Sequence, residues 1–414
     1  MSQPGGTSHN DQHLARAAQA IGSMGLVSPL PAPPVAAAPG PDETWDLDGG
    51  WAWVYYGAGN GGLVRPLVLS DGFDSGPSLL DHIWDGWNGQ GFPFFSELLA
   101  RGRSLVIIGY AERSASILDN AEVAIEAILK TIRNQPDRNG GLVVGGYSMG
   151  GLITRYALAK MEFEGEDHQT ATYFSYDTPH GGAWIPISVQ AFAHYSKELN
   201  SAFSDQVNSP AARQMLWRHI ETVEGKPAED PLRTEFLAEL RRVGSWPSRP
   251  RKIGVANGAG NGTGNQDVPG DAALRCTDVL FDNTALYIQA SSAHQLVAEL
   301  RSILLVSKDV YTDGFPEGDG APGGQLSTFK LIADALNQAV NGNTELFYPD
   351  TCFIPTVSAV AIRDIGTNDG LYTNVDNLPP SESELDEFQC ASTNEGHIHM
   401  TPEHGKWLLE RLSA

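Results

Sequence analysis

The chain is poor in cysteine and in positive charge. Its 414 residues include 3 cysteines, 27 Lys and Arg residues and 50 Asp and Glu residues, which gives a formal net charge of −23. Because the three cysteines are widely spaced, they indicate neither a disulfide framework nor a metal-binding pattern. An acidic surface repels phosphate backbones, so we expect no nucleic-acid partner.

Long apolar runs are also missing. No segment reaches the roughly 18 apolar residues of a membrane-spanning helix, so we expect no membrane span. Residues 1–45 lack the basic start and apolar core of a secretory signal peptide, and we therefore expect a cytoplasmic protein. Pro, Ala and Gly are frequent from Ser28 to Pro41, and we interpret residues 1–45 as a flexible Pro/Ala-rich segment.

The remaining residues, 46–414, form a pattern of alternating strands and helices, without an internal repeat. We predict strands at residues 51–56, 65–70, 103–110, 142–146 and 171–176, and helices at residues 119–135 and 152–161. Such alternation is typical of a parallel sheet with helices on both faces. We therefore predict an α/β fold, in one domain that is long enough to bury a sizeable core.

A break in this pattern predicts an insertion. Residues 183–251 fall into short amphipathic pieces, which we interpret as a helical cap or lid within the domain. We expect strands again at residues 251–260 and 352–362, separated by a polar, glycine-rich region that extends to about residue 324. The chain closes with a predicted helix that has Thr401 as its N-cap and a proline in its first turn.

The stretch LVVGGYSMGGLITRYALAK, residues 142–160, places a serine at the junction of a strand and a helix. Gly146, Ser148 and Gly150 fit the pattern G-x-S-x-G of a nucleophile elbow, in which a sharp turn exposes the serine hydroxyl at the sheet edge. That hydroxyl is a poor nucleophile until a base removes its proton, and the base needs an acid that holds its tautomer.

The base should lie late in the chain. Elbow enzymes of this kind have the order serine, acid, histidine, so the histidine is expected just before the last helix. The stretch TNEGHIHMTPE offers His397 and His399 at that place. The same two histidines have no third ligand at the spacing of a metal site, so we expect no metal.

Several motifs make the chain resemble the serine lipases and esterases of the α/β-hydrolase superfamily, and within it a poorly characterised bacterial group. The motifs are GFD at 72–74, GxSMGG at 146–151, TPHxG at 178–182, FIPTVSA at 353–359 and NExH at 394–397. This resemblance covers the chain from about Trp51 to its end. It implies an α/β-hydrolase fold, a mostly parallel sheet flanked by helices with an inserted cap, and it points to His397 rather than His399 as the base.

The acid has three candidates. We predict Asp369, because it follows the strand expected at residues 353–362 and resembles the N-D-G that carries the catalytic aspartate in some bacterial lipases. Asp386 lies closer to His397 and resembles an aspartate of the bacterial group. Asp267, which follows the strand predicted at residues 251–260, is the third.

Two backbone N–H groups should hold the oxyanion of the tetrahedral intermediate. One belongs to the residue after the nucleophile, Met149, and the other to the loop after an early strand, at Phe73. We therefore predict a serine hydrolase that cleaves a small-molecule carboxylic ester through Ser148, His397 and Asp369, with an acyl-enzyme intermediate. This mechanism needs no cofactor.

Two alternatives stay open. One is an acyltransferase or cyclase, in which an alcohol or amine attacks the same acyl-serine. The other is a catalytically inactive hydrolase fold that serves as a binding protein. The predicted cap is rich in large apolar residues, which is compatible with a lipophilic substrate and equally with packing of the cap onto the sheet. The sequence leaves the oligomeric state open.

Overall fold

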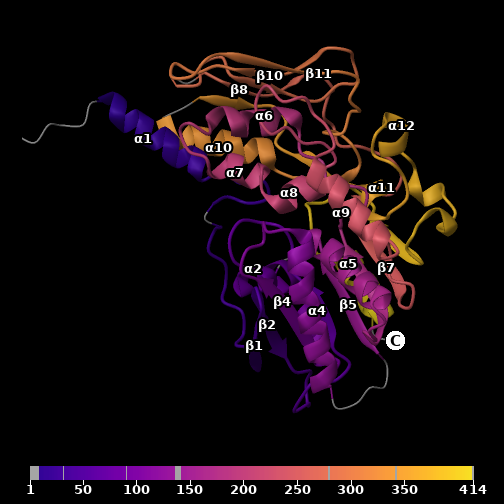
Figure 1. Ribbon diagram of the computed structural model, residues 1–414. Coiled ribbons are helices and arrows are strands. Elements are labelled where there is room, and N and C mark those ends of the chain that lie inside the picture. Colours follow the sequence, from indigo (N-terminus) through magenta and orange to yellow (C-terminus); the bar gives the residue numbers. More distant parts are fainter. Residues whose placement is uncertain are drawn as a thin grey trace, which may run out of the picture.

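The structure is a computed structural model that describes residues 9–30, 32–89, 91–135, 141–277, 280–340 and 343–412. Figure 1 shows two parts, one above the other. The lower part contains a large sheet with helices beside it, and the upper part contains a smaller sheet above several helices.

The large sheet is mostly parallel. Its strands are β1 (Glu43–Leu47), β2 (Gly50–Tyr55), β3 (Leu67–Ser70), β4 (Leu105–Tyr110), β5 (Leu142–Tyr147), β6 (Thr170–Tyr176), β7 (Arg251–Ala259) and β15 (Glu387–Ala391). Within the described residues these eight strands follow the order β1-β2-β4-β3-β5-β6-β7-β15. Only β2 pairs antiparallel, with β1 and with β4. The predicted α/β fold with a mostly parallel sheet is therefore confirmed.

Helices cover both faces of this sheet, because its inner strands are apolar on both sides. The helices are α2 (Leu80–Trp84), α3 (Phe94–Ala100), α4 (Ile117–Asn134), α5 (Met149–Phe163) and α13 (Pro402–Leu412). In β4, Val106 and Ile108 belong to the hydrophobic cluster that includes α4 and α5. The alternate residues Leu105 and Ile107 belong to a second cluster, with side chains of α2, α3 and α13.

Helices also fill the interval between β6 and β7, where the sequence predicts an insertion at residues 183–251. They are α6 (Ile187–Ser196), α7 (Ala202–Val207), α8 (Pro210–Met215) and α9 (Pro231–Arg242). The starts of α8 and α9 follow their sequence signals, since each has a proline at its beginning and a capping side chain, from Ser209 and Asp230 respectively.

A second sheet takes all but one of its described strands from the region that the sequence indicates to be polar and glycine-rich; the exception is β13. Its strands are β8 (Ala272–Cys276), β9 (Ala285–Tyr287), β10 (Gln295–Leu300), β11 (Lys308–Thr312) and β13 (Thr344–Leu346), in the antiparallel order β11-β10-β9-β8-β13. This sheet was not predicted. The strands are short, three to six residues each, so each depends on its neighbours for stability.

The remaining elements are mostly short. They are the antiparallel pair β12 (Gly323–Leu326) and β14 (Thr351–Pro355), the helices α10 (Thr328–Val340), α11 (Thr356–Ala359) and α12 (Asn368–Leu371), the single-turn helices η2 (Val375–Asn377) and η3 (Pro380–Glu382), and a π-helical turn η1 (Asp85–Gly89). The strand expected at residues 352–362 is therefore shorter than predicted, because the chain turns into α11 after Pro355.

The N-terminal region differs from the expected flexible segment at residues 1–45. Residues His9–Gly22 form helix α1, which packs against α10, and β1 already begins at Glu43. Ile21, Met24 and Leu26 are buried in the larger hydrophobic cluster. The apolar side chains in this region therefore anchor it to the core, although the residues that follow are rich in proline and alanine.

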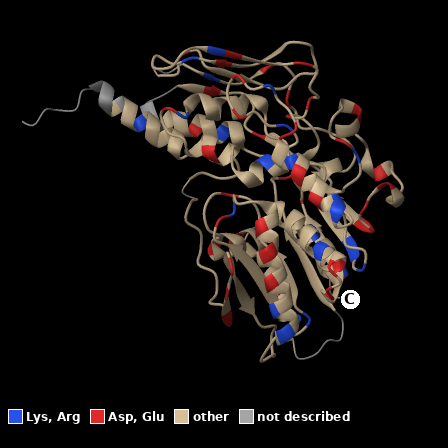
Figure 2. Ribbon diagram, in the orientation of Figure 1, with Lys and Arg blue, Asp and Glu red and all other residues tan. Residues whose placement is uncertain are grey.

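Charged residues are spread over the helices and loops of both parts, as Figure 2 shows, with acidic and basic residues interspersed. Among the helices of the described residues, none combines the length and the apolar content needed to cross a membrane.

Candidate active site

Ser148 forms the sharp turn between β5 and α5. Its φ is 51° and its ψ is −131°, a conformation that is uncommon for a residue other than glycine and that matches the strained turn of a nucleophile elbow. The flanking glycines make this turn fit. A Cβ at Gly146 would overlap the backbone of Gly150, and a Cβ at Gly150 would overlap the carbonyl oxygens of Ser70 and Asp71. The turn therefore places Ser148 at the carboxyl edge of the sheet, close to the end of β3.

The structure brings His397 to this serine. The Nε2 atom of His397 lies 2.8 Å from Ser148 Oγ. His397 belongs to a loop of residues 393–399, here called the histidine loop, which connects β15 to α13. Its backbone N–H donates to the carbonyl oxygen of Gln325 in β12, and its ring meets the Phe353 ring edge to face at 4.8 Å. The side chain of His397 is 5% exposed, so these contacts cover most of its surface.

The carboxylate beside His397 is that of Asp177. Its Oδ2 lies 2.7 Å from Nδ1 of His397, and its Oδ1 accepts a hydrogen bond of 2.9 Å from the backbone N–H of Asn257. Asp177 is completely buried. It directly follows β6, which pairs in parallel with β5 and ends at the same edge of the sheet, where Tyr147 lies opposite Tyr176. A carboxylate directly after β6 is therefore close to Ser148, which directly follows β5.

The structure does not bring the predicted acid Asp369 to this histidine. Asp369 is exposed, in the short helix α12. Asp386 precedes β15 and accepts a hydrogen bond from the N–H of Lys252, near the start of β7. In a parallel sheet the strand starts lie at the edge opposite to the strand ends, so this position is far from Ser148. Asp267 hydrogen bonds to Asn265 at 3.0 Å, and burial raises its pKa to about 7.

The sequence did contain a signal for Asp177. A carboxylate follows the predicted strand at 171–176 directly, and that strand is the next one after the strand of the elbow. Sequence reasoning placed the acid after a later strand instead, near the histidine in the chain. Whether two strands are neighbours in a sheet depends on contacts distant in sequence, and local patterns do not report them.

Asn257 in β7 fixes the histidine loop as well as Asp177. Its Nδ2 donates to the carbonyl oxygens of Gly396 at 2.6 Å and His399 at 3.1 Å. The neighbouring Asn394 accepts at Oδ1 from the backbone N–H of Ala259. His399 itself contacts Glu395 at 3.4 Å, and its side chain is 42% exposed, so it is not part of the contacts around Ser148.

The two expected oxyanion donors lie near Ser148. Met149 is the first residue of α5, so its N–H has no acceptor within the helix. Phe73 lies in the loop Asp71–Asp74, here called the oxyanion loop, and lines the same cavity as Ser148. A Cβ at Gly72 would lie 3.2 Å from Cβ of Ser148, so the loop passes close to this serine.

Buried Asp71 holds the oxyanion loop in place. It accepts hydrogen bonds from the Gly72 N–H at 2.7 Å, from the hydroxyl of Ser78 and from the hydroxyl of Tyr147, the residue before Ser148. Burial raises the pKa of Asp71, while these donors favour its ionised form. The loop and the elbow are therefore connected through one carboxyl group.

A cavity of about 470 Å³ opens at the serine. Its walls come from the segment after α1, the oxyanion loop, α2, β12, α10 and the histidine loop; the apolar lining residues are Val27, Pro29, Ala32, Pro33, Phe73, Leu79, Ile83, Leu326, Leu331 and Ile398. This volume lies within the range of about 300–1,000 Å³ that is common for small-molecule sites. Across the described ranges, no three His, Cys, Asp or Glu side chains gather as they would around a metal ion.

Comparisons with known proteins find only distant similarity, to solved structures. No protein-family model and no curated protein matches the chain. Solved structures that are similar include a lipase from Bacillus licheniformis, with 13% identity over 50% of this chain and 72% of that one, and a TM-score of 0.32. An esterase from the archaeon Pyrobaculum calidifontis is 14% identical over 61% and 74%, with a TM-score of 0.32. Brefeldin A esterase is 16% identical over 61% and 79%, with a TM-score of 0.27. At these values the likeness carries no argument about fold or activity.

The packing at the elbow predicts a large difference between two glycine substitutions. Gly150→Ala should destabilise the protein by about 1–3 kcal/mol, since its Cβ would overlap two backbone oxygens. Gly61→Ala is the matched control, because a Cβ there meets nothing within 4 Å. Its effect should stay within about 0.5 kcal/mol. Thermal unfolding would compare the two, and equal melting temperatures would contradict the close approach of β3 to the elbow.

Proposed function

We propose that the protein is a serine hydrolase that cleaves a carboxylic ester of a small molecule, with Ser148 as nucleophile, His397 as base and Asp177 as acid. The main support is the unbroken chain of hydrogen bonds from Ser148 Oγ to Nε2 of His397, at 2.8 Å, and from Nδ1 to Asp177, at 2.7 Å. Both distances lie within the reach that nucleophile, base and orienting group need. Relative to the sequence-based prediction, Asp177 replaces Asp369.

In the proposed acylation step, His397 Nε2 takes the proton of Ser148 as Oγ attacks the acyl carbon. The Asp177 carboxylate accepts the Nδ1–H hydrogen bond, which fixes the tautomer and stabilises the imidazolium that forms. The carbonyl oxygen becomes an oxyanion, and the N–H groups of Met149 and Phe73 are the proposed donors to it. The imidazolium then protonates the leaving alcohol as the ester C–O bond breaks.

Deacylation repeats these steps with water. His397 takes a proton from water, the hydroxide adds to the acyl carbon, and the second tetrahedral intermediate collapses as the imidazolium returns a proton to Ser148 Oγ. The products are the carboxylic acid and the free enzyme, so atoms and charge balance without a cofactor.

Replacement of the nucleophile tests the whole mechanism. Ser148→Ala should lower turnover of p-nitrophenyl esters by about a millionfold if the three residues act as a unit. The side chain is small and the change removes only the hydroxyl, so the melting temperature should hardly change. A fluorophosphonate probe should label the wild-type protein, with loss of fluoride, and should not label the variant. A wild-type protein that is neither labelled nor active would instead be a binding protein.

The two late histidines provide a matched pair. His397→Ala should reduce turnover about as much as loss of the serine, because the hydroxyl then has no base. His399→Ala removes an exposed side chain that contacts Glu395, and its activity should stay within about twofold of the wild-type value. Steady-state kinetics on both variants would test this. The reverse ranking would transfer the role of base to His399.

The acid can be tested by removing charge without changing shape. Asp177→Asn should lower kcat by about 10⁴, since an amide no longer holds the catalytic tautomer of the histidine. Asp369→Asn is the control, because Asp369 is exposed in α12, and it should keep nearly full activity. Kinetics at constant pH on both variants would distinguish the two aspartates. If Asp369→Asn is crippled and Asp177→Asn is normal, the assignment of the acid is overturned.

A further inference from the structure

The N-terminal strap, defined here as residues Met24–Leu30, crosses from the upper part of the molecule to the site. Figure 1 shows the chain running from α1 in the upper part to β1 in the lower part. At the start of the strap, Met24 and Leu26 are each 1% exposed and belong to the larger hydrophobic cluster. The first residues of the strap are therefore fixed by burial.

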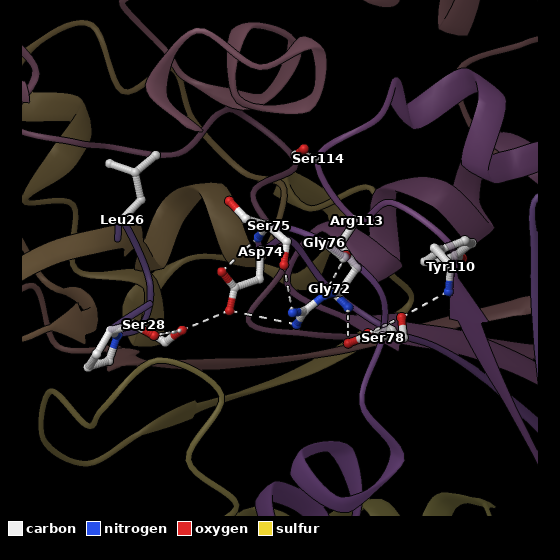
Figure 3. Close-up of polar contacts among 12 residues, drawn as sticks. Leu26, Ser28, Gly72, Asp74, Ser75, Gly76, Ser78, Tyr110, Arg113 and Ser114 are labelled. Carbon is white, nitrogen blue, oxygen red and sulfur yellow. Dashed lines mark hydrogen bonds and ion pairs between the residues drawn. The ribbon is translucent and has the colours of Figure 1, made fainter. Parts of the chain in front are cut away.

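Polar contacts fix the strap at two further places. The backbone N–H of Leu26 donates to Oε1 of Gln206 in α7 at 2.7 Å. The hydroxyl of Ser28 donates to Oδ2 of Asp74 at 2.8 Å, and Gln206 donates to Oδ1 of the same carboxylate at 3.1 Å. Arg113 completes the group with an ion pair of 3.7 Å to Asp74, as Figure 3 shows. Because Asp74 follows Phe73, the strap is tied to the oxyanion loop.

The strap and the residues after it line the cavity at Ser148. Val27 and Pro29 from the strap, together with Ala32 and Pro33, form an apolar wall. Other apolar lining residues come from different elements, including Leu326 of β12 and Leu331 of α10. Hydrocarbon bound between these side chains would lose contact with water, which is favourable by about 0.8 kcal/mol per buried methylene.

Arg113 belongs to the lining of this cavity, but it does not favour an anionic substrate. Arg113 donates to the carbonyl oxygens of Ser75 at 3.1 Å and Gly76 at 3.3 Å, besides its ion pair with Asp74. Its charge is thus already compensated by a carboxylate in the same wall. The chain as a whole carries a net charge of −23, which also disfavours an anion.

We propose that the strap, with Ala32 and Pro33, is the wall that binds the hydrocarbon group of an uncharged ester and limits its length. The inference rests on the proposed hydrolase function and adds the substrate class: a neutral ester with an apolar chain that fits a cavity of about 470 Å³. The strap thereby determines specificity, while the reacting atoms are handled by Ser148 and His397.

Two alanines of the same segment provide the test. Ala32 lines the cavity, whereas Ala36 is exposed and is not among its lining residues. Kinetics of Ala32→Trp, Ala36→Trp and the wild type would be compared on p-nitrophenyl esters from acetate to dodecanoate. Ala32→Trp should lower kcat/KM for octanoate and longer esters at least about tenfold and leave acetate within about twofold. Ala36→Trp should match the wild type on every ester.

If Ala32→Trp does not fold, a second variant that enlarges the cavity instead of filling it tests the same inference. Val27→Ala enlarges the cavity from the strap side, and it should shift the preferred ester to a longer chain. Labelling of Ser148 by fluorophosphonates with short and long alkyl groups gives the same comparison without turnover, so it also applies if a leaving group other than p-nitrophenol is required.

The outcomes separate the two proposals. If the wild-type protein is labelled at Ser148 but the folded variants keep its chain-length preference in both turnover and labelling, the strap inference is overturned and the hydrolase function stands. If the wild-type protein is neither labelled nor active, the proposed function fails first. If Ala32→Trp selectively loses activity on long-chain esters and Ala36→Trp does not, the result supports both the strap inference and the hydrolase function.

Discussion

The hydrogen bond between buried Asp177 and His397 is the interaction around which the rest of the site is organised. A carboxylate with no solvent exposure needs partners, because an unpaired buried charge costs several kcal/mol. Here the partners are the ring of His397 and the N–H of Asn257. The side chain of Asn257 in turn holds the histidine loop, so that the proposed acid and the proposed base are positioned by the same residue of β7.

The upper part of the molecule contributes to this interaction. A Cβ at Gly324 in β12 would overlap Oδ2 of Asp177, so only glycine lets this strand cover the carboxylate. The next residue, Gln325, accepts the N–H of His397 at its carbonyl oxygen. Farther away, Asp319 accepts hydrogen bonds from Trp184, before α6, and from Gln289, after β9, and burial raises its pKa to about 6. The insertions after β6 and β7 are therefore bound to one another and to the site.

The sequence predicted well those features that arise from local patterns. Short apolar runs located β4 and β5, and apolar residues at helical spacing located α4. The small residues around Ser148 located the elbow. Each of these signals depends only on neighbours within one turn or one strand. The position of His397 followed from a motif. Asp177 could not be chosen in the same way, because its proximity to His397 depends on the parallel pairing of β6 with β5 and on the 220 residues between the two side chains. The second sheet was missed for a related reason, since strands of three to six residues gain their stability from pairing.

Two neighbouring carboxyl groups connect substrate binding with the oxyanion loop. Asp71 is buried and accepts a hydrogen bond from the hydroxyl of Tyr147, the residue before Ser148. Asp74 accepts hydrogen bonds from Ser28 of the strap and from Gln206 of α7. The loop between them carries the Phe73 N–H that is the proposed oxyanion donor. Donors stabilise a developing charge most when they need no rearrangement during the reaction. The oxyanion loop is held at both ends, by the contacts of Asp71 and of Asp74, and so satisfies this condition. Because Ser28 is one of the partners of Asp74, the strap belongs to the contacts that hold the loop. The N-terminal segment has the composition of a flexible leader. Under the two proposals it would contribute both to the choice of substrate and to the position of the proposed oxyanion donor.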